Sequence, residues 1–188
     1  REPLESGVVN LHRSGIHARY PASFQLVMAS NPCPCGGRRG GRRCTCSSIA
    51  RRRYMARLSG PLLDRMDIRI DVHTPTRADM AASGASDSAT IRERVCAARE
   101  RSRHRLAGTP WTCNAQLPGV WIRRHSGIDA DLVAQLCRLV DAGASSMRGI
   151  DRMLRLAWTL ADLDGAPTPT FDHIVAAQQL RNGHDHDN

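Results

Sequence analysis

Four cysteines in one short segment constrain this chain more than any other feature. They form two Cys-x-Cys pairs, Cys33 with Cys35 and Cys44 with Cys46, and only glycine and arginine separate the pairs. Each pair is too close in sequence to close comfortably on itself as a disulfide. Four thiolates on two turns can instead surround one tetrahedral ion, for which zinc fits best. The spacing is tighter than that of the usual Cys-x-x-Cys pairs, so free thiols and disulfides between the pairs stay open as alternatives.

A metal held in this way would be structural, because a site closed by four cysteines leaves no position open for chemistry. The loop between the pairs also carries four arginines, Arg38, Arg39, Arg42 and Arg43. Projecting from a metal-pinned turn, they would suit contacts with phosphate groups. A solvated loop is the alternative, because lysine is absent and all 27 basic residues of the chain are arginine. The remaining cysteines, Cys96, Cys113 and Cys137, lie in or near apolar helical patterns and are predicted to be small core residues.

The overall charge indicates a polyanionic partner. The chain of 188 residues has a formal net charge of +9 and a pI of about 10.1. We expect nucleic acid before a membrane surface, because no apolar stretch approaches the roughly 18 residues of a membrane span. The sequence shows no secretory signal, so a cytoplasmic location is expected.

The first part of the chain mixes strand and helix patterns. Residues 1–7 resemble the end of a helix closed by glycine, and residues 8–22 predict a hairpin around Ser14 and Gly15. The apolar run from Phe24 to Ser30 has the length of a buried parallel strand. Ser47 or Ser48 is placed to cap an arginine-rich helix over residues 49–58. The alternating run from Asp67 to His73 predicts another strand.

The second part of the chain is helical. Small and polar residues dominate around residues 74–90, where we place a boundary. Helical periodicity follows in four segments, which are Ile91 to Leu106, Ala130 to Asp141, Ser146 to Leu163 and Thr170 to Leu180. The predicted organisation is therefore a strand-containing region at 1–76, a linker at 77–87, a helical domain at 88–182 and a disordered tail at 183–188.

Three stretches together resemble a known family. They are "FQLVMASNPCPCGG", "SGPLLDRMDIRIDV" and "SMRGIDRMLRLAWTLADLDG". In this order they look like the C-terminal half of the magnesium-chelatase-like AAA+ ATPases, the bacterial group that includes the competence protein ComM. The resemblance implies an α/β fold, in which residues 1–76 are the C-terminal part of a P-loop NTPase core with parallel strands and residues 88–182 are an all-α lid. It also implies a homo-oligomer, expected as a hexameric ring, that works on DNA in recombination and natural transformation.

The same resemblance implies roles for three residues. Asn31 matches sensor 1, which orients the water that attacks the γ-phosphate, although a turn residue at a strand end is the simpler interpretation. Arg65 matches the arginine finger that reaches the nucleotide of a neighbouring subunit, against the alternative of an ion pair with Asp64 or Asp67. Arg148 matches the sensor 2 arginine of the lid. Its alternative is an exposed first-turn arginine, which the helix dipole mildly disfavours.

The departures from the family pattern are informative as well. A chain without lysine cannot contain the Gly-x-x-x-x-Gly-Lys-Ser/Thr loop that cradles phosphates, and no apolar run ends in the paired acidic residues of a Walker B element. We therefore expect a fragment of a longer ATPase, whose complete form uses ATP and Mg²⁺, and which alone does not hydrolyse ATP. The alternatives are a stand-alone zinc-stabilised nucleic-acid-binding protein and a subunit that inserts magnesium into a tetrapyrrole.

Overall fold

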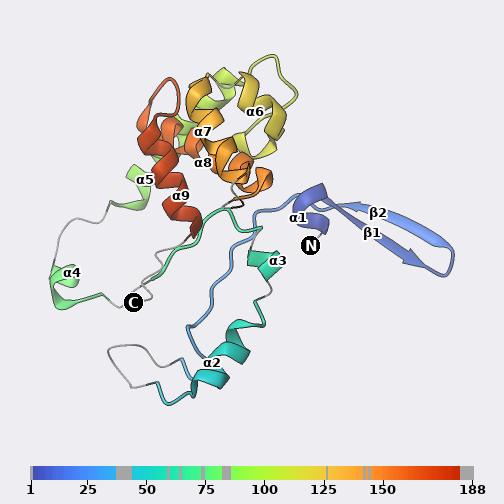
Figure 1. Cartoon of the computed structure of the whole chain (residues 1–188), viewed down its shortest axis with the longest axis vertical. Coiled ribbons are helices and arrows are strands. Elements are labelled where there is room, and N and C mark those ends of the chain that lie inside the picture. Colours follow the sequence, from blue (N-terminus) through green and yellow to red (C-terminus); the bar gives the residue numbers. More distant parts are fainter. Residues whose placement is uncertain are drawn as a thin grey trace. The chain divides into compact units, whose positions relative to one another are not determined.

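The structure, a computed structural model, describes residues 2–36, 44–58, 60–63, 65–72, 75–81, 86–125, 127–141, 143 and 145–182. These residues fall into two compact units that divide between Met66 and Asp67. Figure 1 labels the helices and strands of both units. No helix in the described part of the chain has both the length and the apolar character that crossing a membrane requires.

The first unit begins with a short helix and a hairpin. Helix α1 (Glu2–Ser6) ends at Gly7, and β1 (Val8–Arg13) pairs antiparallel with β2 (Ile16–Pro21). Ser14 and Gly15 have φ values of 48° and 79°. A two-residue hairpin turn of type I′ requires positive φ at both of its central residues. The predicted helix end and the predicted hairpin are therefore confirmed.

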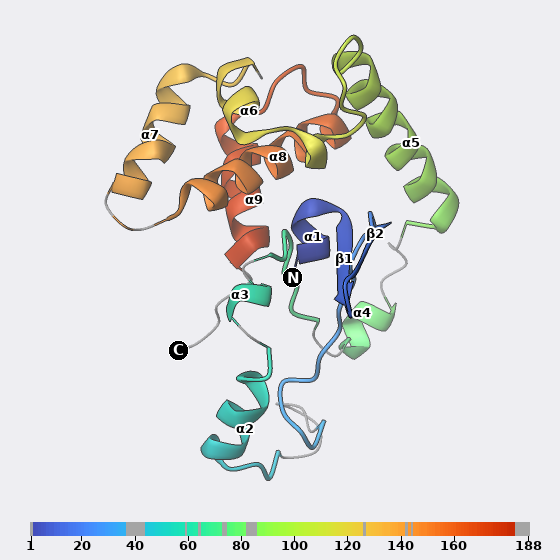
Figure 2. The ribbon, with the colours of Figure 1, turned by 90° about the vertical axis from the view of Figure 1, so that its right-hand side faces the viewer.

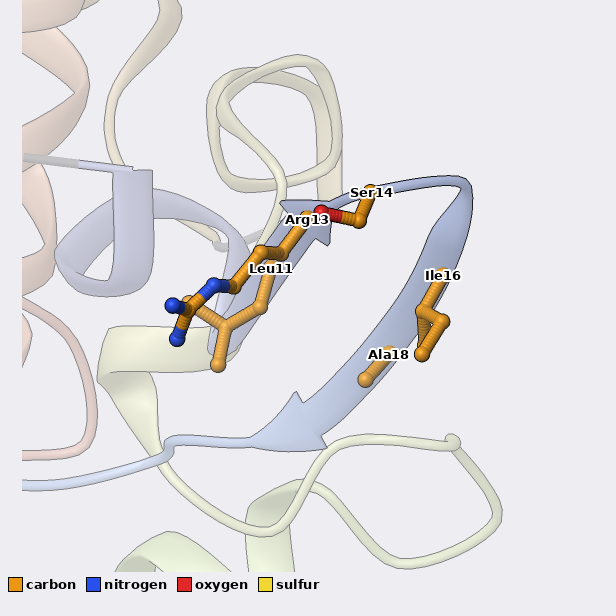
Figure 3. A pocket seen from close by; sticks show the side chains of 5 residues that line it. All are labelled: Leu11, Arg13, Ser14, Ile16 and Ala18. Carbon is orange, nitrogen blue, oxygen red and sulfur yellow. The ribbon is translucent and has the colours of Figure 1, made fainter.

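The hairpin has two chemically different faces. Leu11 lies opposite Ala18, and Arg13 lies opposite Ile16, so alternation places these residues on one face. Figure 3 shows their side chains lining a pocket together with Ser14 at the turn. The other face carries His12 and His17, whose rings meet edge to face with centroids 4.2 Å apart. Near the turn this second face is polar.

Two predicted strands are wrong in this structure. Residues 22–31 and 67–72 adopt no regular secondary structure, and His73 lies outside the described residues. The predicted parallel strands therefore have no counterpart, and the described strands form only the β1–β2 hairpin. The apolar residues of both runs are exposed, as Val27 and Val72 show with 83% of their surface accessible. A strand needs a neighbour for its backbone groups, and neither run has one among the described residues.

Two helices complete the first unit. Helix α2 (Ser48–Met55) starts after Ser47, whose hydroxyl accepts a hydrogen bond from the Ala50 N–H at 3.2 Å. This confirms the predicted arginine-rich helix and its serine cap, although the helix ends three residues earlier than expected. Helix α3 (Gly60–Leu63) is a single turn. It was not predicted, because one turn is too short to show a helical period.

The second unit is helical, as predicted. Its elements in order are α4 (Arg77–Ala81), α5 (Ser88–Arg105), the 3₁₀ turn η1 (Asn114–Gln116), α6 (Gly119–His125), α7 (Ala130–Asp141), α8 (Met147–Asp164) and α9 (Phe171–Asn182). The four long helices were predicted, and α7 has the predicted bounds. The short elements α4, η1 and α6 were not predicted, because none is long enough to display periodicity.

Helix α8 forms the centre of this unit. Figure 2 shows it between α5 and α7, with α6 and α9 also packed against it. Leu154, Ala157 and Ala161 are fully buried, and Trp158 retains 2% of its surface exposed. Burying apolar area of this kind stabilises the fold by about 25 cal/mol per Å². The helix ends at Gly165, whose φ of 72° gives the left-handed cap that glycine favours.

The three cysteines outside the four-cysteine segment are not the core residues predicted. Cys96 and Cys113 are exposed, and Cys137 is only partly buried against the core. On α5 the buried positions are Ala98 and Ser102, which are four residues apart and so share one face. Cys96 lies two residues before Ala98 and therefore on another side of the helix. Its apolar neighbours in sequence are not its neighbours in space.

Candidate functional site

The structure brings the four cysteines Cys33, Cys35, Cys44 and Cys46 together. The Sγ atom of Cys33 lies 3.2 Å from that of Cys35 and 3.4 Å from that of Cys44, and Cys35 and Cys44 are 3.7 Å apart. All four Sγ atoms, including that of Cys46, lie within 4.8 Å of one another. We call this group the thiol cluster. All of its members are free thiols, so the disulfide alternative is not what the structure shows.

The thiol cluster fits a tetrahedral zinc ion. With Zn–S bonds of about 2.3 Å, tetrahedral geometry places the sulfur atoms about 3.8 Å apart. The three sulfur distances of 3.2, 3.4 and 3.7 Å need only small outward movements to reach that value. Four sulfur donors also match the chemistry that zinc prefers, and they leave no open position for a substrate. The residues present therefore fit a structural ion.

One backbone turn and the segment before α2 present these thiols. The turn runs from Cys33 to Gly36, where the Gly36 N–H donates to the Cys33 carbonyl at 3.2 Å and Gly36 has a φ of 63°. The segment with Cys44 and Cys46 has no regular structure and leads directly into α2, because Cys46 precedes the capping Ser47. Cys33 has 2% of its surface exposed, which makes it the buried member of the cluster. An ion here would join the turn to the start of α2.

Crowding within the cluster raises the pKa of two of its thiols. The hydrogen bond with the Cys35 thiol raises the pKa of Cys33 to about 12, and burial adds to this effect. The same neighbour raises the pKa of Cys46. A bound zinc ion would displace the thiol protons, because thiolates are the ligands.

The four loop arginines, Arg38, Arg39, Arg42 and Arg43, lie outside the described residues. Their contact with phosphate groups stays a prediction. The described residues place the two ends of their loop, Gly36 and Cys44, at the thiol cluster.

The two predicted nucleotide-contacting residues of the first unit flank the apolar runs. Asn31 is exposed and precedes the cysteine turn. Its Nδ2 atom lies 3.6 Å from the position that a Cβ on Gly36 would occupy, so its side chain borders that turn. Arg65 is partly buried, and its N–H donates to the Leu62 carbonyl at 3.0 Å in the turn after α3. Their roles stay predictions.

The predicted sensor 2 residue belongs to the second unit. Arg148 is the second residue of α8 and is exposed. The preceding Ser146 caps the helix by accepting a hydrogen bond from the Gly149 N–H at 3.1 Å. The N-terminus of a helix carries partial positive charge, which favours anions and disfavours an arginine. The position of Arg148 is thus suited to an anionic ligand, and its role stays a prediction.

Other charged residues near α8 were not predicted. The Arg152 Nε lies 3.8 Å from a carboxylate oxygen of Asp67, and the Arg155 Nε donates to the Leu117 carbonyl at 2.8 Å. Burial lowers the pKa of Arg155, an effect that Asp67 opposes and Arg152 strengthens. The spacing of four residues from Arg148 to Arg152 indicates one shared face, and this was the available signal.

A buried polar network joins α5, η1 and α8. Asp162 has 2% of its surface exposed, forms an ion pair with Arg105 and accepts a hydrogen bond from the Asn114 Nδ2 at 2.8 Å. The Arg105 guanidinium also lies 3.8 Å from the centre of the Trp158 ring. Buried carboxylates require such partners. The signal in the sequence was an aspartate on the otherwise apolar face of a long helix.

Comparison with known proteins gives matches over both units. The family profile described as "Magnesium chelatase, subunit ChlI" matches residues 1–80, and the profile "Magnesium chelatase, subunit ChlI C-terminal" matches residues 85–181. The chain is 40% identical over 181 residues to Rv2897c of Mycobacterium tuberculosis (strain H37Rv). It is 36% identical over 184 residues to YifB of Escherichia coli (strain K12), and 35% identical over 183 residues to the competence protein ComM of Haemophilus influenzae (strain Rd).

Each of these alignments covers 96% of the chain but only 36% of Rv2897c and 35% of YifB and ComM. The chain thus spans about a third of the length of the relatives it matches. The two family profiles follow one another with a gap of four residues, Ala81 to Gly84, inside the predicted linker. The chain therefore belongs to the magnesium chelatase subunit ChlI family, with YifB and ComM among its relatives.

Proposed function

We propose that the chain is the C-terminal part of an AAA+ ATPase of the ComM type, an ATP-driven motor that acts on DNA in recombination and natural transformation. The family supports an ATPase that works as an oligomer. The name of the Haemophilus relative, a competence protein, supports a role in DNA uptake. In this proposal ATP and Mg²⁺ are bound mainly by a preceding part of the complete protein, and this chain supplies residues that act on the bound nucleotide.

The exposed apolar runs are the observation that carries this proposal. Residues 24–30 end next to Asn31, and residues 67–72 begin two residues after Arg65. Both runs have strand-like sequences, yet both are irregular and exposed, with no strand neighbour among the described residues. Apolar side chains at 83% exposure, such as Val27 and Val72, need a cover. In a nucleotide-binding sheet, neighbouring strands would pair with the backbones of these runs and helices on the two faces would cover their side chains, and the sheet would bring Asn31 to the edge where nucleotides bind.

The proposed roles follow from the chemistry of each side chain. The Asn31 amide would orient the attacking water, and Arg148 would contact the γ-phosphate within its own subunit. Arg65 would reach the nucleotide of a neighbouring subunit and balance the charge of the transition state. A finger that acts between subunits requires a ring, for which we propose a hexamer.

The thiol cluster would hold one zinc ion as a scaffold for the loop that bears Arg38, Arg39, Arg42 and Arg43. Those arginines, with Arg13 and Arg19 of the hairpin, would then contact the DNA backbone. Contacts with phosphate carry little base information, so the proposed binding has weak sequence preference.

ATP turnover tests the proposed roles. This chain alone is expected not to hydrolyse ATP, because finger and sensors act only on a nucleotide that a P-loop already holds. We would fuse the chain behind the remaining part of Rv2897c, of which the match covers 36%. In this fusion protein, Arg65→Ala should lower kcat by roughly 10³-fold or more while sparing nucleotide binding. The control Arg57→Ala, an exposed arginine of the same unit, should leave kcat unchanged.

Two outcomes would contradict this assignment. Equal turnover in the Arg65→Ala and Arg57→Ala fusion proteins would remove the finger role. Metal-dependent ATP turnover by the 188-residue chain alone, lost on Arg65→Ala, would show that the chain carries its own nucleotide cradle.

DNA binding across a salt series tests the loop. Affinity should fall steeply with salt, and replacing the four loop arginines by alanine should reduce the slope by up to about four phosphate equivalents. An unchanged slope would assign the DNA contact elsewhere, most directly to Arg51, Arg52 and Arg53, which lie exposed on α2.

A second function is favoured by the thiol cluster itself. A stand-alone zinc-stabilised protein that binds nucleic acid needs only this cluster and the basic loop. The fusion experiment separates the two, because such a protein would bind DNA with the predicted salt slope while Arg65→Ala left ATP turnover untouched.

A further inference from the structure

The chain segment that follows Arg65 is fastened to the helical unit by two contacts. A carboxylate oxygen of Asp67 lies 3.8 Å from the Arg152 Nε on α8. The Arg69 N–H donates a hydrogen bond of 2.7 Å to the carbonyl of Leu180 on α9. Both contacts lie within the second unit, which begins at Asp67. The fastened segment therefore starts only two residues after the proposed finger.

Arg152 is set up to hold an acidic partner. Its side chain is only 12% exposed, whereas that of Asp67 is 65% exposed. It lies one helical turn after Arg148, so both arginines share a face of α8. Arg155 adds a second partly buried positive charge nearby, and the effects of Asp67 and Arg152 on its pKa have opposite signs. The Asp67 carboxylate thus offsets the charge of two arginines.

We propose that Asp67 and Arg152 are positioning residues that fix the chain after the proposed finger to the helix that carries Arg148. This inference rests on the proposed function for the roles of Arg65 and Arg148, but the anchor itself does not. When Arg148 moves to contact a nucleotide, helix α8 moves with Arg148 and shifts the segment that starts at Asp67. The phosphate-contacting residue of one subunit is in this way linked to the residue that serves its neighbour.

Amide hydrogen exchange on the 188-residue chain tests the anchor. The reporter is the Arg69 amide, which donates to the Leu180 carbonyl. Asp67→Asn and Arg152→Gln should each speed its exchange roughly two- to fivefold, as expected for loss of a partly exposed ion pair. The charge-reversed double variant, Asp67→Arg with Arg152→Asp, should restore slow exchange. Arg138→Gln, which removes an exposed arginine of α7, is the matched control and should change nothing.

A purely structural role of either residue would not give rescue by charge reversal, so rescue is the decisive readout. If the Arg69 amide exchanges in both single variants at the rate seen in the Arg138→Gln control, the proposed anchor is refuted. Failure of the double variant to restore slow exchange, with an unchanged thermal midpoint, would overturn it as well.

Steady-state ATP turnover of the fusion protein tests the link to catalysis. Asp67→Asn should lower kcat by roughly two- to fivefold with little change in KM, because the kinetic effect is bounded by the free energy of the partly exposed ion pair that is lost. If Arg65→Ala lowers kcat and Asp67→Asn does not, the positioning inference fails and the proposed function stands. If Arg65→Ala has no effect, the proposed function fails, and hydrogen exchange still decides whether the anchor exists.

Discussion

Replacing one cysteine of the thiol cluster should show whether the cluster binds zinc or consists of unligated thiols. The perturbation is Cys44→Ser, which takes away a sulfur that lies 3.4 Å from Cys33 and 3.7 Å from Cys35. Serine has nearly the same shape but supplies a poor ligand for zinc. The control is Cys96→Ser, because Cys96 is an exposed cysteine in another unit and outside the cluster.

The size of the effect follows from the geometry. The closest sulfur pair is 3.2 Å apart and must open to about 3.8 Å around the ion. This small adjustment costs little, so affinity should be that of a full four-thiolate site, for which the binding free energy is about 10–16 kcal/mol. An equal share for each ligand is about 2.5–4 kcal/mol. Loss of one ligand should therefore weaken binding by roughly 60- to 800-fold.

Metal analysis and chelator competition measure this effect. The purified chain should contain one zinc per molecule under reducing conditions, and the Cys96→Ser variant should match it. The Cys44→Ser variant should lose its zinc at a chelator concentration roughly 60- to 800-fold lower. Zinc content near zero in the unmodified chain, or equal chelator sensitivity of the two variants, would refute the reasoning.

Two further predictions concern the helical unit. Asp162→Ala should lower the free energy of unfolding by about 3–5 kcal/mol, because it leaves Arg105 and Asn114 without their buried acceptor. Urea unfolding followed by tryptophan fluorescence measures this change. A loss no larger than that caused by Asp131→Asn, at an exposed position, would contradict the prediction. The Asp87 side chain caps α5 by accepting from the Thr90 N–H at 2.7 Å, and this bond lowers the pKa of Asp87. The stabilisation by this cap is thus present above the unfolded pKa of Asp87 and is lost as the pH falls below about 4. Amide exchange at the start of α5 should therefore accelerate below about pH 4. Asp87→Asn should remove that acceleration.

Local signals explain which parts of the fold could be predicted. Helix α7 has the predicted bounds, and α8 begins after the serine that caps it. Both could be predicted because helical periodicity and capping depend on residues that are close together in the sequence. The hairpin was predictable for the same reason, since Ser14 and Gly15 suffice to turn the chain. The runs at 24–30 and 67–72 carry equally clear strand patterns. The strand predictions for these two runs were wrong because a strand also requires a partner strand, which the residues of the run itself do not supply.

For the candidate site, too, local features could be predicted from the sequence and long-range contacts could not. The thiol cluster could be predicted because two tight cysteine pairs need only one loop to meet. The link from Asp67 to Arg152 and the network around Asp162 join residues far apart in sequence. Their charges were visible in the sequence, but their partners depend on how α5, α8 and α9 pack. The roles of Asn31, Arg65 and Arg148 came from the family resemblance and stay predictions.

The exposed run at residues 24–28 also has a consequence for the life of this polypeptide. Phe24, Val27 and Met28 are all accessible in an irregular segment that contains no charge and no proline. Windows of this composition stack readily into cross-β aggregates when nothing covers them. A cell that makes this chain without a covering sheet would meet the same surface that chaperones and proteases recognise in misfolded proteins. Covering that run is therefore expected to raise the solubility of this chain.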